Sequence, residues 1–307
     1  MARKPSSKDG SMDRDRPMND GEGATLVCGG GGVWGVAWMT GLCKGIADLG
    51  LDLCSMSSFV GTSAGSVVAS NLLGPFSIVE LYERQTVPEL QPFEKAPAAG
   101  GIEALVTTMA SAGESQVDRL HAIRALAMNA ATISHEERLA DIRARLGRSD
   151  DAWPDKPLKL TAVDMETLEL IVFDSSSGVA LPEAVAASCA VPGVWPPAQI
   201  LGRSYIDGGV WRTAENAHLA STPGPVVILS PLGQVARMAT RGSTGLDEDV
   251  QQLRRMGSRV VVIEADGEAL KTATLGVLDP ATRRPAAEAG RRQAETAIDA
   301  IAGVLGA

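Results

Sequence analysis

The stretch Gly61-Thr62-Ser63-Ala64-Gly65 decides how the middle of this chain is expected to fold. A short apolar segment ends in Phe59-Val60 just before it, and a helical segment over residues 66–73 follows it. A strand, a Gly-x-Ser-x-Gly turn and a helix form the layout of a nucleophile elbow, which presents a serine hydroxyl at a helix N-terminus. A chain with 33 glycines produces such a pentapeptide by chance, so the flanking elements carry the prediction.

A glycine-rich turn lies upstream of this elbow. Residues 24–28 form a short apolar strand that runs into Gly29–Gly32, and a helix is expected from about Val36 to Leu49. Gly50 then ends this helix. Strand, glycine loop, helix and second strand make a βαβ opening, so we expect an α/β fold with a mostly parallel sheet between helices.

Downstream, the pattern becomes helical and then returns to strands. Residues 81–150 begin with an irregular proline-rich linker and continue with three helically spaced apolar segments, which we interpret as a helical insertion. The insertion is either a lid over a substrate pocket or a structural layer. The expected elements that follow are a hairpin (158–163 and 168–173), a helix (182–188), strands (204–206, 226–229 and 260–263) and a C-terminal helix (286–305).

Bulk properties restrict the class of protein. Apolar residues make up 45% of the 307 residues and charged residues 21%, which is typical of a globular chain. A net charge of −9 argues against a nucleic-acid partner. The chain has no apolar run of transmembrane length and no signal-peptide core, so we expect a cytoplasmic protein, with transient membrane association. The four cysteines, none in a CxxC pair, are expected to be buried free thiols.

Residues 1–23 contain almost nothing that a core would bury, and we expect a disordered leader there. Residues 24–307 are expected to form a single domain that includes the insertion. The oligomeric state is not predicted.

A serine hydroxyl becomes a nucleophile only when a base removes its proton. His121 and His135 lie in the helical insertion, and His218 lies in what looks like a helix start. The candidate base is instead Asp207, which leaves a short strand and is followed by Gly208-Gly209. Partial desolvation would raise the pKa of its carboxyl toward the range of a general base. The alternative is that Asp-Gly-Gly only forms a turn.

The glycine loop has two interpretations. Backbone amides of Gly30, Gly31 and Gly32 would stabilise the oxyanion of an ester hydrolysis. The same loop also fits Gly-x-Gly-x-x-Gly through Gly35, and Asp52 lies near the position of a ribose-binding acid. The elbow after the next strand favours the oxyanion interpretation, because a nucleotide-binding fold has no need of it.

Three motifs occur in order: the glycine loop, Gly-Thr-Ser-Ala-Gly, and Asp-Gly-Gly about 140 residues later. In this arrangement, and in the stretch 187–193, the chain resembles the patatin-like phospholipase family over roughly residues 24–232. The resemblance implies a three-layer α/β/α fold and a Ser63–Asp207 dyad that hydrolyses lipid esters, phospholipid or neutral, through an acyl-enzyme. It implies an oxyanion loop at Gly30–Gly32, with no metal and no cofactor.

One position departs from the family pattern. Trp34 stands where the family usually has Arg or Lys, which favours a neutral or less phosphate-dependent ester. Three tryptophans flank the expected site in sequence and are candidates for its pocket, although core packing would explain them equally well: Trp34, Trp195 and Trp211. The glycines expected to support the motifs are Gly35, Gly61, Gly65, Gly208 and Gly209.

The sequence therefore favours a serine acyl hydrolase acting on lipid esters. Three alternatives stay open. The first is a patatin-like scaffold with weak or no catalysis, for which Trp34 is the main support. The second is a Rossmann-type nucleotide binder, and the third is an α/β-hydrolase triad that uses His218.

Overall fold

The structure is a computed structural model, which describes residues 23–92, 95–113, 115–148, 150–240 and 245–306. The leader expected over residues 1–23 therefore lies, apart from Gly23, outside the described residues. The single-domain interpretation of residues 24–307 stays a prediction.

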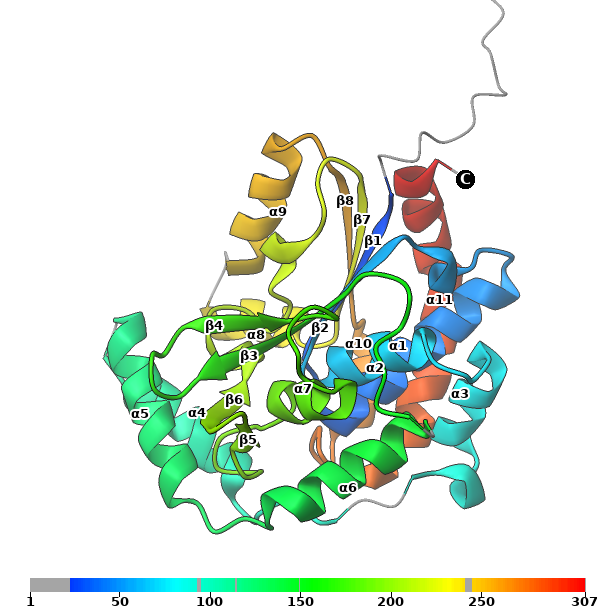
Figure 1. Ribbon diagram of the computed structural model, residues 1–307. Helices are drawn as coiled ribbons and strands as arrows, with labels where there is room; N and C mark the ends of the chain where they lie inside the picture. Colours follow the sequence, from blue (N-terminus) through cyan, green and yellow to red (C-terminus); the bar gives the residue numbers. More distant parts are fainter. Residues whose placement is uncertain (1–22, 93–94, 114, 149, 241–244, 307) are drawn as a thin grey trace, which may run out of the picture.

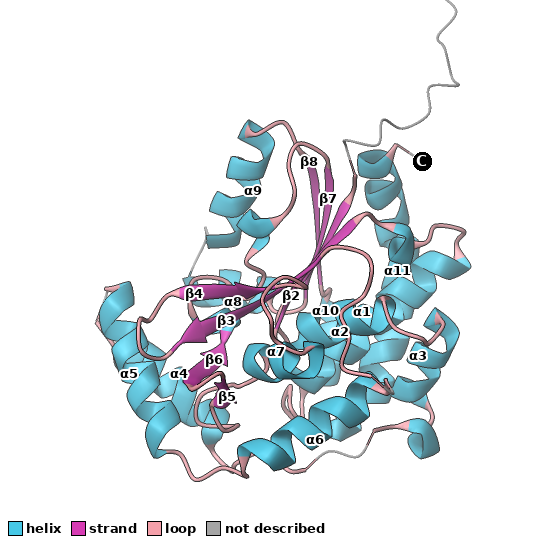
Figure 2. Cartoon of the chain, viewed as in Figure 1, coloured by secondary structure: helices cyan, strands magenta, loops and turns pink. Residues whose placement is uncertain are grey.

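The described residues form one eight-stranded sheet through the middle of the molecule (Figures 1 and 2). β1, β2, β3, β7 and β8 make its parallel part, whereas β4, β5 and β6 pair antiparallel on the β3 side. In spatial order the strands are β5 (Ala198–Ile200), β6 (Arg203–Asp207), β3 (Leu158–Asp164), β2 (Ser58–Thr62), β1 (Thr25–Cys28), β7 (Pro225–Ser230) and β8 (Arg259–Glu264), with β4 (Leu170–Phe173) paired to β3.

Alternate residues of the strands face two different helical layers. Leu26, Phe59 and Leu160 pack in the larger core, together with helices that Figure 1 shows largely on the right and below the sheet. These helices are α1 (Gly32–Asp48), α2 (Ala64–Leu72), α3 (Ile78–Thr86), α6 (His135–Leu146), α7 (Leu181–Ser188), α10 (Gly267–Leu270) and α11 (Arg283–Leu305).

The opposite face of the sheet is covered by fewer helices. Val27 and Val60 pack against α9 (Gly245–Arg255), and Val163 packs against α4 (Gly101–Ser111) and α5 (Gln116–Asn129). Helix α8 (Gly233–Thr240) follows β7. The remaining elements are short 3-10 helices: η1 (Leu53–Ser55), η2 (Pro88–Leu90), η3 (Gly208–Val210), η4 (Ala217–Leu219), η5 (Lys271–Ala273) and η6 (Pro280–Thr282).

The expected fold class, with a mostly parallel sheet between two helical layers, is confirmed. The helix after the glycine loop, however, begins at Gly32, four residues earlier than expected. Glycine has a low helix propensity, so the sequence suggested a loop there. Tertiary contacts override that propensity: the Trp34 amide, in the first turn, donates to the Val277 carbonyl at 3.0 Å.

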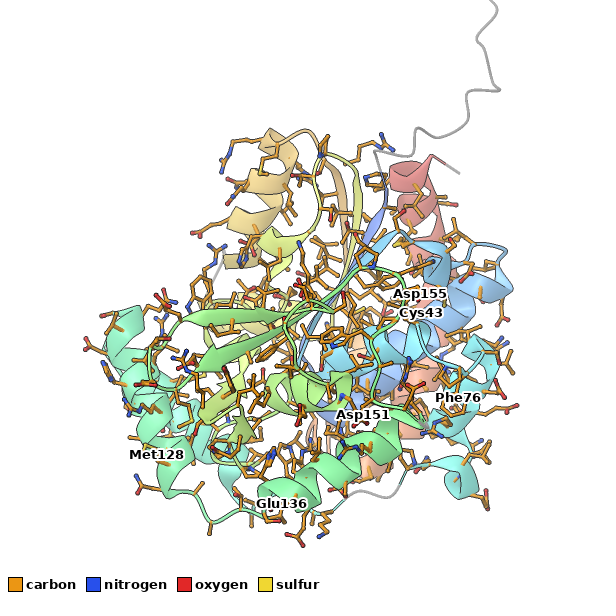
Figure 3. The ribbon with its side chains drawn as sticks, viewed as in Figure 1. Cys43, Phe76, Met128, Glu136, Asp151 and Asp155 are labelled. Carbon is orange, nitrogen blue, oxygen red and sulfur yellow. The ribbon has the colours of Figure 1, made fainter. Side chains whose placement is uncertain are left out.

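The segment expected as a helical insertion supplies helices to both faces of the sheet. α4 and α5 lie on the α9 face, whereas α6 packs in the larger core on the other face. Figure 3 shows Met128 on α5 and Glu136 on α6, both toward the lower edge of the view. The insertion is thus not one continuous layer, and α6 is the part of it that reaches the site below.

Candidate active site

The glycine loop and the serine turn leave neighbouring parallel strands at the same edge of the sheet. The register pairs Cys28 of β1 with Gly61 of β2, so the residues after each strand meet. Ser63 has φ 53° and ψ −120°, a strained backbone conformation for a residue with a side chain. This is the sharp strand-to-helix turn expected from the Gly-x-Ser-x-Gly stretch.

Gly65 allows the first turn of α2 to contact the end of β1. A β-carbon at this position would lie 1.8 Å from the carbonyl oxygen of Cys28, so only glycine fits. The resulting close approach brings Ser63 against the glycine loop: a β-carbon at Gly30 would lie 3.5 Å from the β-carbon of Ser63.

Three neighbours hold the backbone of the serine. Its amide donates to Ser188 Oγ at 2.9 Å, and its carbonyl accepts from Ser66 Oγ at 2.6 Å and from Cys189 Sγ at 3.2 Å. Burial raises the pKa of the Cys189 thiol, which keeps this group protonated as a donor. Ser188 and Cys189 lie at the end of α7, so this helix fixes the turn.

Asp207 reaches the serine from two strands away. Thr161 of β3 pairs with Thr62 of β2, and the next β3 residue, Ala162, pairs with Asp207 of β6. Asp207 therefore lies level with Ser63, close enough for the Ser63 side chain to lower the pKa of its carboxyl. The Gly209 amide donates to Asp207 Oδ1 at 2.8 Å.

Burial controls the titration of Asp207. Desolvation raises the pKa of its carboxyl to about 6, against the lowering effects of the Ser63 side chain and of the hydrogen bond from the Gly209 amide. A carboxyl of this pKa is ionised at neutral pH, yet accepts a proton more readily than an exposed aspartate. The arrangement therefore places a serine hydroxyl near a carboxylate that can accept a proton at neutral pH.

Asn216 is a site residue that the sequence analysis did not identify. Its side-chain amide donates to Thr62 Oγ1 at 3.2 Å, to Thr161 Oγ1 at 3.4 Å and to the Gly208 carbonyl at 3.2 Å. The side chain is fully buried. The Asn216 side chain thus joins β2, which ends just before Ser63, to Gly208, which directly follows Asp207. The only signal in the sequence is its place a few residues after Asp-Gly-Gly.

Replacing Asn216 with alanine is expected to lower the free energy of unfolding by about 2–3 kcal/mol, because it leaves buried acceptors without a donor. Urea denaturation followed by circular dichroism measures this loss. An exposed polar residue, Gln199 of β5, provides the comparison, since its alanine variant should change stability by less than about 0.5 kcal/mol. Equal effects of the two substitutions would contradict the role given to Asn216.

The glycine loop presents fewer amides than expected. The Gly30 amide donates to the Ala214 carbonyl at 2.8 Å, so it is used by the fold, and the expectation that Gly30 stabilises an oxyanion is corrected. The amides of Gly31 and Gly32 have no acceptor among the described residues. They lie at the N-cap and first position of α1, where the helix dipole favours negative charge.

A small cavity adjoins the serine. It has a volume of about 20 Å³, room for about one water molecule, and its walls come from the glycine loop, the elbow, α6, α7 and the loop before η6. The residues that line it are Gly32, Val33, Val36, Ser63, Ala64, Arg138, Arg145, Cys189, Val191, Trp195 and Leu278.

Of the three tryptophans considered for a pocket, only Trp195 lines this cavity. Trp34 is fully buried, stacks on Trp38 and donates to Thr272 Oγ1 at 2.8 Å, so it belongs to the core. Trp211 packs against His218 with ring centroids 5.9 Å apart. Of the two explanations considered for Trp34 and Trp211, the structure therefore favours packing over a place in this cavity.

Two arginines of α6, Arg138 and Arg145, also line the cavity and were not anticipated. Both are buried, and the Arg138 guanidinium lies over the Trp195 ring, 3.9 Å from its centroid. They lie seven residues apart on one face of a charged amphipathic helix, which the sequence alone does not distinguish from a solvated helix. The two arginines thus give the cavity wall positive charge, which the uncharged Trp34 side chain cannot supply.

Neither the His218 triad nor the Rossmann-type nucleotide site has the geometry it needs. His218 contacts Asp249, with Nδ1 3.5 Å from Oδ2, and burial, with the charge of Arg212, lowers its pKa. The residues on either side of His218 pack with α9, on the other face of the sheet. Asp52 caps η1 before β2, at the amino end of that strand, whereas the glycine loop follows the carboxyl end of β1. A ribose-binding acid would lie at the carboxyl end.

A comparison with models of protein families places most of this chain in one family. The sequence profile described as "Patatin-like phospholipase" matches residues 26–217, more than half of the chain. The chain belongs to the patatin-like phospholipase family. The resemblance seen in the three motifs is therefore confirmed, and the match contains the glycine loop, Ser63 and Asp207. A comparison with curated protein sequences finds no match.

Solved structures of similar fold cover most of this chain but only part of their own. Human GIVD cytosolic phospholipase A2 is 10% identical with a TM-score of 0.54, and the match covers 96% of this chain and 63% of that one. VipD from Legionella pneumophila is 14% identical with a TM-score of 0.47. The match covers 91% of this chain and 67% of VipD. ExoU from Pseudomonas aeruginosa, solved in complex with SpcU, is 14% identical with a TM-score of 0.40. The match covers 89% of this chain and 53% of ExoU.

In the part of the chain that the structure describes, no helix is both long and apolar enough to cross a membrane. No group of three or more His, Cys, Asp and Glu side chains among the described residues is arranged to hold a metal ion.

Proposed function

We propose that this protein is a serine hydrolase of lipid carboxylic esters, with Ser63 as nucleophile and Asp207 as general base. The observation that carries the proposal is the strand register that brings Ser63, at a strained elbow, level with the buried carboxylate of Asp207. The membership of the chain in the patatin-like phospholipase family supports the lipid ester as substrate.

The reaction would proceed in two halves. Ser63 Oγ attacks the ester carbonyl carbon while Asp207 takes the hydroxyl proton, which gives a tetrahedral oxyanion. The intermediate collapses, the C–O bond to the alcohol breaks, and Asp207 returns the proton to the departing alkoxide. Water then loses a proton to Asp207 and attacks the acyl-serine, and the acid leaves as Ser63 regains its proton.

The amides of Gly31 and Gly32 are proposed to hold the oxyanion. Each preorganised donor contributes about 3 kcal/mol to transition-state stabilisation in comparable hydrolases. Both amides lie where the dipole of α1 adds to this effect.

The proposed substrates include phospholipids as well as neutral esters. Trp34 stands where the family usually has a basic residue, and the absence of that charge favoured a neutral ester as substrate. Arg138 and Arg145 place positive charge in the cavity wall from a different element, so a phosphate group near the ester would still meet cations there.

A pH profile combined with active-site labelling tests this function. Hydrolysis of p-nitrophenyl butyrate is expected to rise about tenfold per pH unit below about pH 6 and to level off above it, because Asp207 must be ionised to accept the proton. A fluorophosphonate should label Ser63, identified by peptide mass spectrometry, with the same pH dependence.

Two results would count against the proposal. One is a folded protein that neither hydrolyses esters of any chain length nor reacts with the fluorophosphonate; this supports the scaffold alternative. The other is labelling on a residue other than Ser63.

A further inference from the structure

A groove of about 500 Å³ lies next to the small cavity at Ser63, a volume within the range of sites that bind small organic molecules. One wall is the segment that leads into α4, and the other is the loop between η5 and η6. The groove is lined by Lys95 to Glu103, Trp195 and Leu275 to Pro280, which are mostly alanine, glycine, proline and aliphatic residues.

Among the described residues, two line both the groove and the cavity: Trp195 and Leu278. They therefore form the partition between the groove and Ser63. Trp195 is anchored, since its amide donates to the Val191 carbonyl at 3.0 Å and Arg138 stacks on its ring. Leu278 also covers the glycine loop: a β-carbon at Gly32 would lie 2.9 Å from Leu278 Cδ2.

This position of Leu278 has a consequence for the reaction. An ester carbonyl that reaches the Gly32 amide must occupy the space beside it, and the cavity holds only about one water molecule. Of the two residues in the partition, Trp195 is anchored, so displacement of the Leu278 side chain would enlarge this space and join the cavity to the groove.

The outer end of the groove continues as an apolar surface. Ile102 lines the groove, and Val106 and Met109 follow it at positions i+4 and i+7 on the same face of α4, both exposed. On the opposite wall, Leu275 is 64% exposed. Exposed apolar side chains that border a groove are typical of contact with an apolar partner.

We propose that the groove binds the acyl chain of the lipid ester and that Leu278 is the movable residue through which the ester reaches Ser63. The inference rests on the proposed function, since it assigns the substrate's chain to a place beside the proposed nucleophile. Val106, Met109 and Leu275 then face the lipid aggregate from which the chain enters the groove.

The test fills the groove without touching the serine. Ala99 lines the groove and is exposed, so Ala99→Trp should fold and occupy space that an acyl chain needs. The matched control is Met256→Trp, which adds the same side chain at an exposed position following α9. Hydrolysis of p-nitrophenyl palmitate and butyrate is measured for both variants and the wild type.

The ratio of palmitate to butyrate turnover is expected to fall about tenfold in Ala99→Trp and to stay unchanged in Met256→Trp. A tenfold change corresponds to about 1.4 kcal/mol, the contribution of about two buried methylene groups. In parallel, a fluorescent C16 fatty acid is titrated into Ser63→Ala, with and without Ala99→Trp. Its Kd should rise about tenfold with the added tryptophan.

The outcomes separate the two proposals. If butyrate turnover depends on Ser63 but neither the ratio nor the fatty-acid Kd responds to Ala99→Trp, the groove inference is overturned and the function stands. If no ester is hydrolysed yet the fatty acid binds and Ala99→Trp weakens it, the groove stands and the function fails. Should Ala99→Trp not fold, Leu278→Ala serves instead, with an expected rise of about threefold in the palmitate ratio and no rise counting against the inference.

Discussion

Replacing Ser63 with alanine is expected to lower kcat/KM for ester hydrolysis at least about 10³-fold, because it removes the proposed nucleophile. Asp207→Asn should cause a loss of similar size, since an amide cannot accept the serine proton. The two losses should not add in the double variant, because both residues act in the same proton transfer. Initial rates with p-nitrophenyl butyrate measure all three variants.

The control for Ser63→Ala is Ser70→Ala, on the same helix. Ser70 is fully buried and its hydroxyl has no hydrogen-bond partner among the described residues, so its removal should leave both turnover and stability nearly unchanged. Loss of activity in Ser70→Ala, or substantial turnover in folded Ser63→Ala, would show that the rate does not depend on the proposed nucleophile.

Asp207→Asn also has an expected effect on stability, which separates loss of the base from loss of the fold. The folded-state pKa of Asp207, about 6, lies above that of the unfolded chain. Ionisation therefore costs stability as the pH rises from about 4 through 6. Without that charge, Asp207→Asn should be more stable than the wild type above pH 6, by up to about 3 kcal/mol, and similar to it near pH 4.

The sequence was sufficient for the central features of the fold because these depend on local pattern. Short apolar strands bounded by glycine turns predicted the parallel sheet, and the spacing of Gly61, Ser63 and Gly65 predicted the turn. Asp207 was identified from its place at a strand end, although the register between β3 and β6 that brings it level with Ser63 is visible only in the structure.

Long-range contacts explain what the sequence could not predict. The Gly30 amide is used by Ala214, nearly 200 residues away, so the choice among loop amides is made by tertiary structure. Arg138, Arg145 and Leu278 also line the cavity. The sequence pattern predicts a helix around the two arginines and no regular element around Leu278, but it does not predict that these segments meet at the serine. The order of the helices and strands could be predicted from local sequence pattern, whereas the walls of the cavity depend on how segments distant in the sequence pack together.

The second large effect is expected at Gly65, where the elbow meets the neighbouring strand. In Gly65→Ala the new β-carbon would lie 1.8 Å from the Cys28 carbonyl oxygen, which is backbone at the end of a fully buried strand. A flexible side chain would move aside, but here α2 must separate from β1, and the Ser63 turn with it. We expect the free energy of unfolding to fall by about 4 kcal/mol or more.

A second glycine-to-alanine substitution provides the comparison, because the sign of its effect should be opposite. Gly303 lies exposed within α11, and a β-carbon added there would have no neighbour within 4 Å, so Gly303→Ala adds helix propensity without a clash. Its unfolding free energy should rise by about 0.5–1 kcal/mol. Urea denaturation of both variants beside the wild type measures the difference. If Gly65→Ala were as stable as Gly303→Ala, the contact between elbow and strand could not be as close as the structure has it, and the geometry inferred for Ser63 would have to be abandoned.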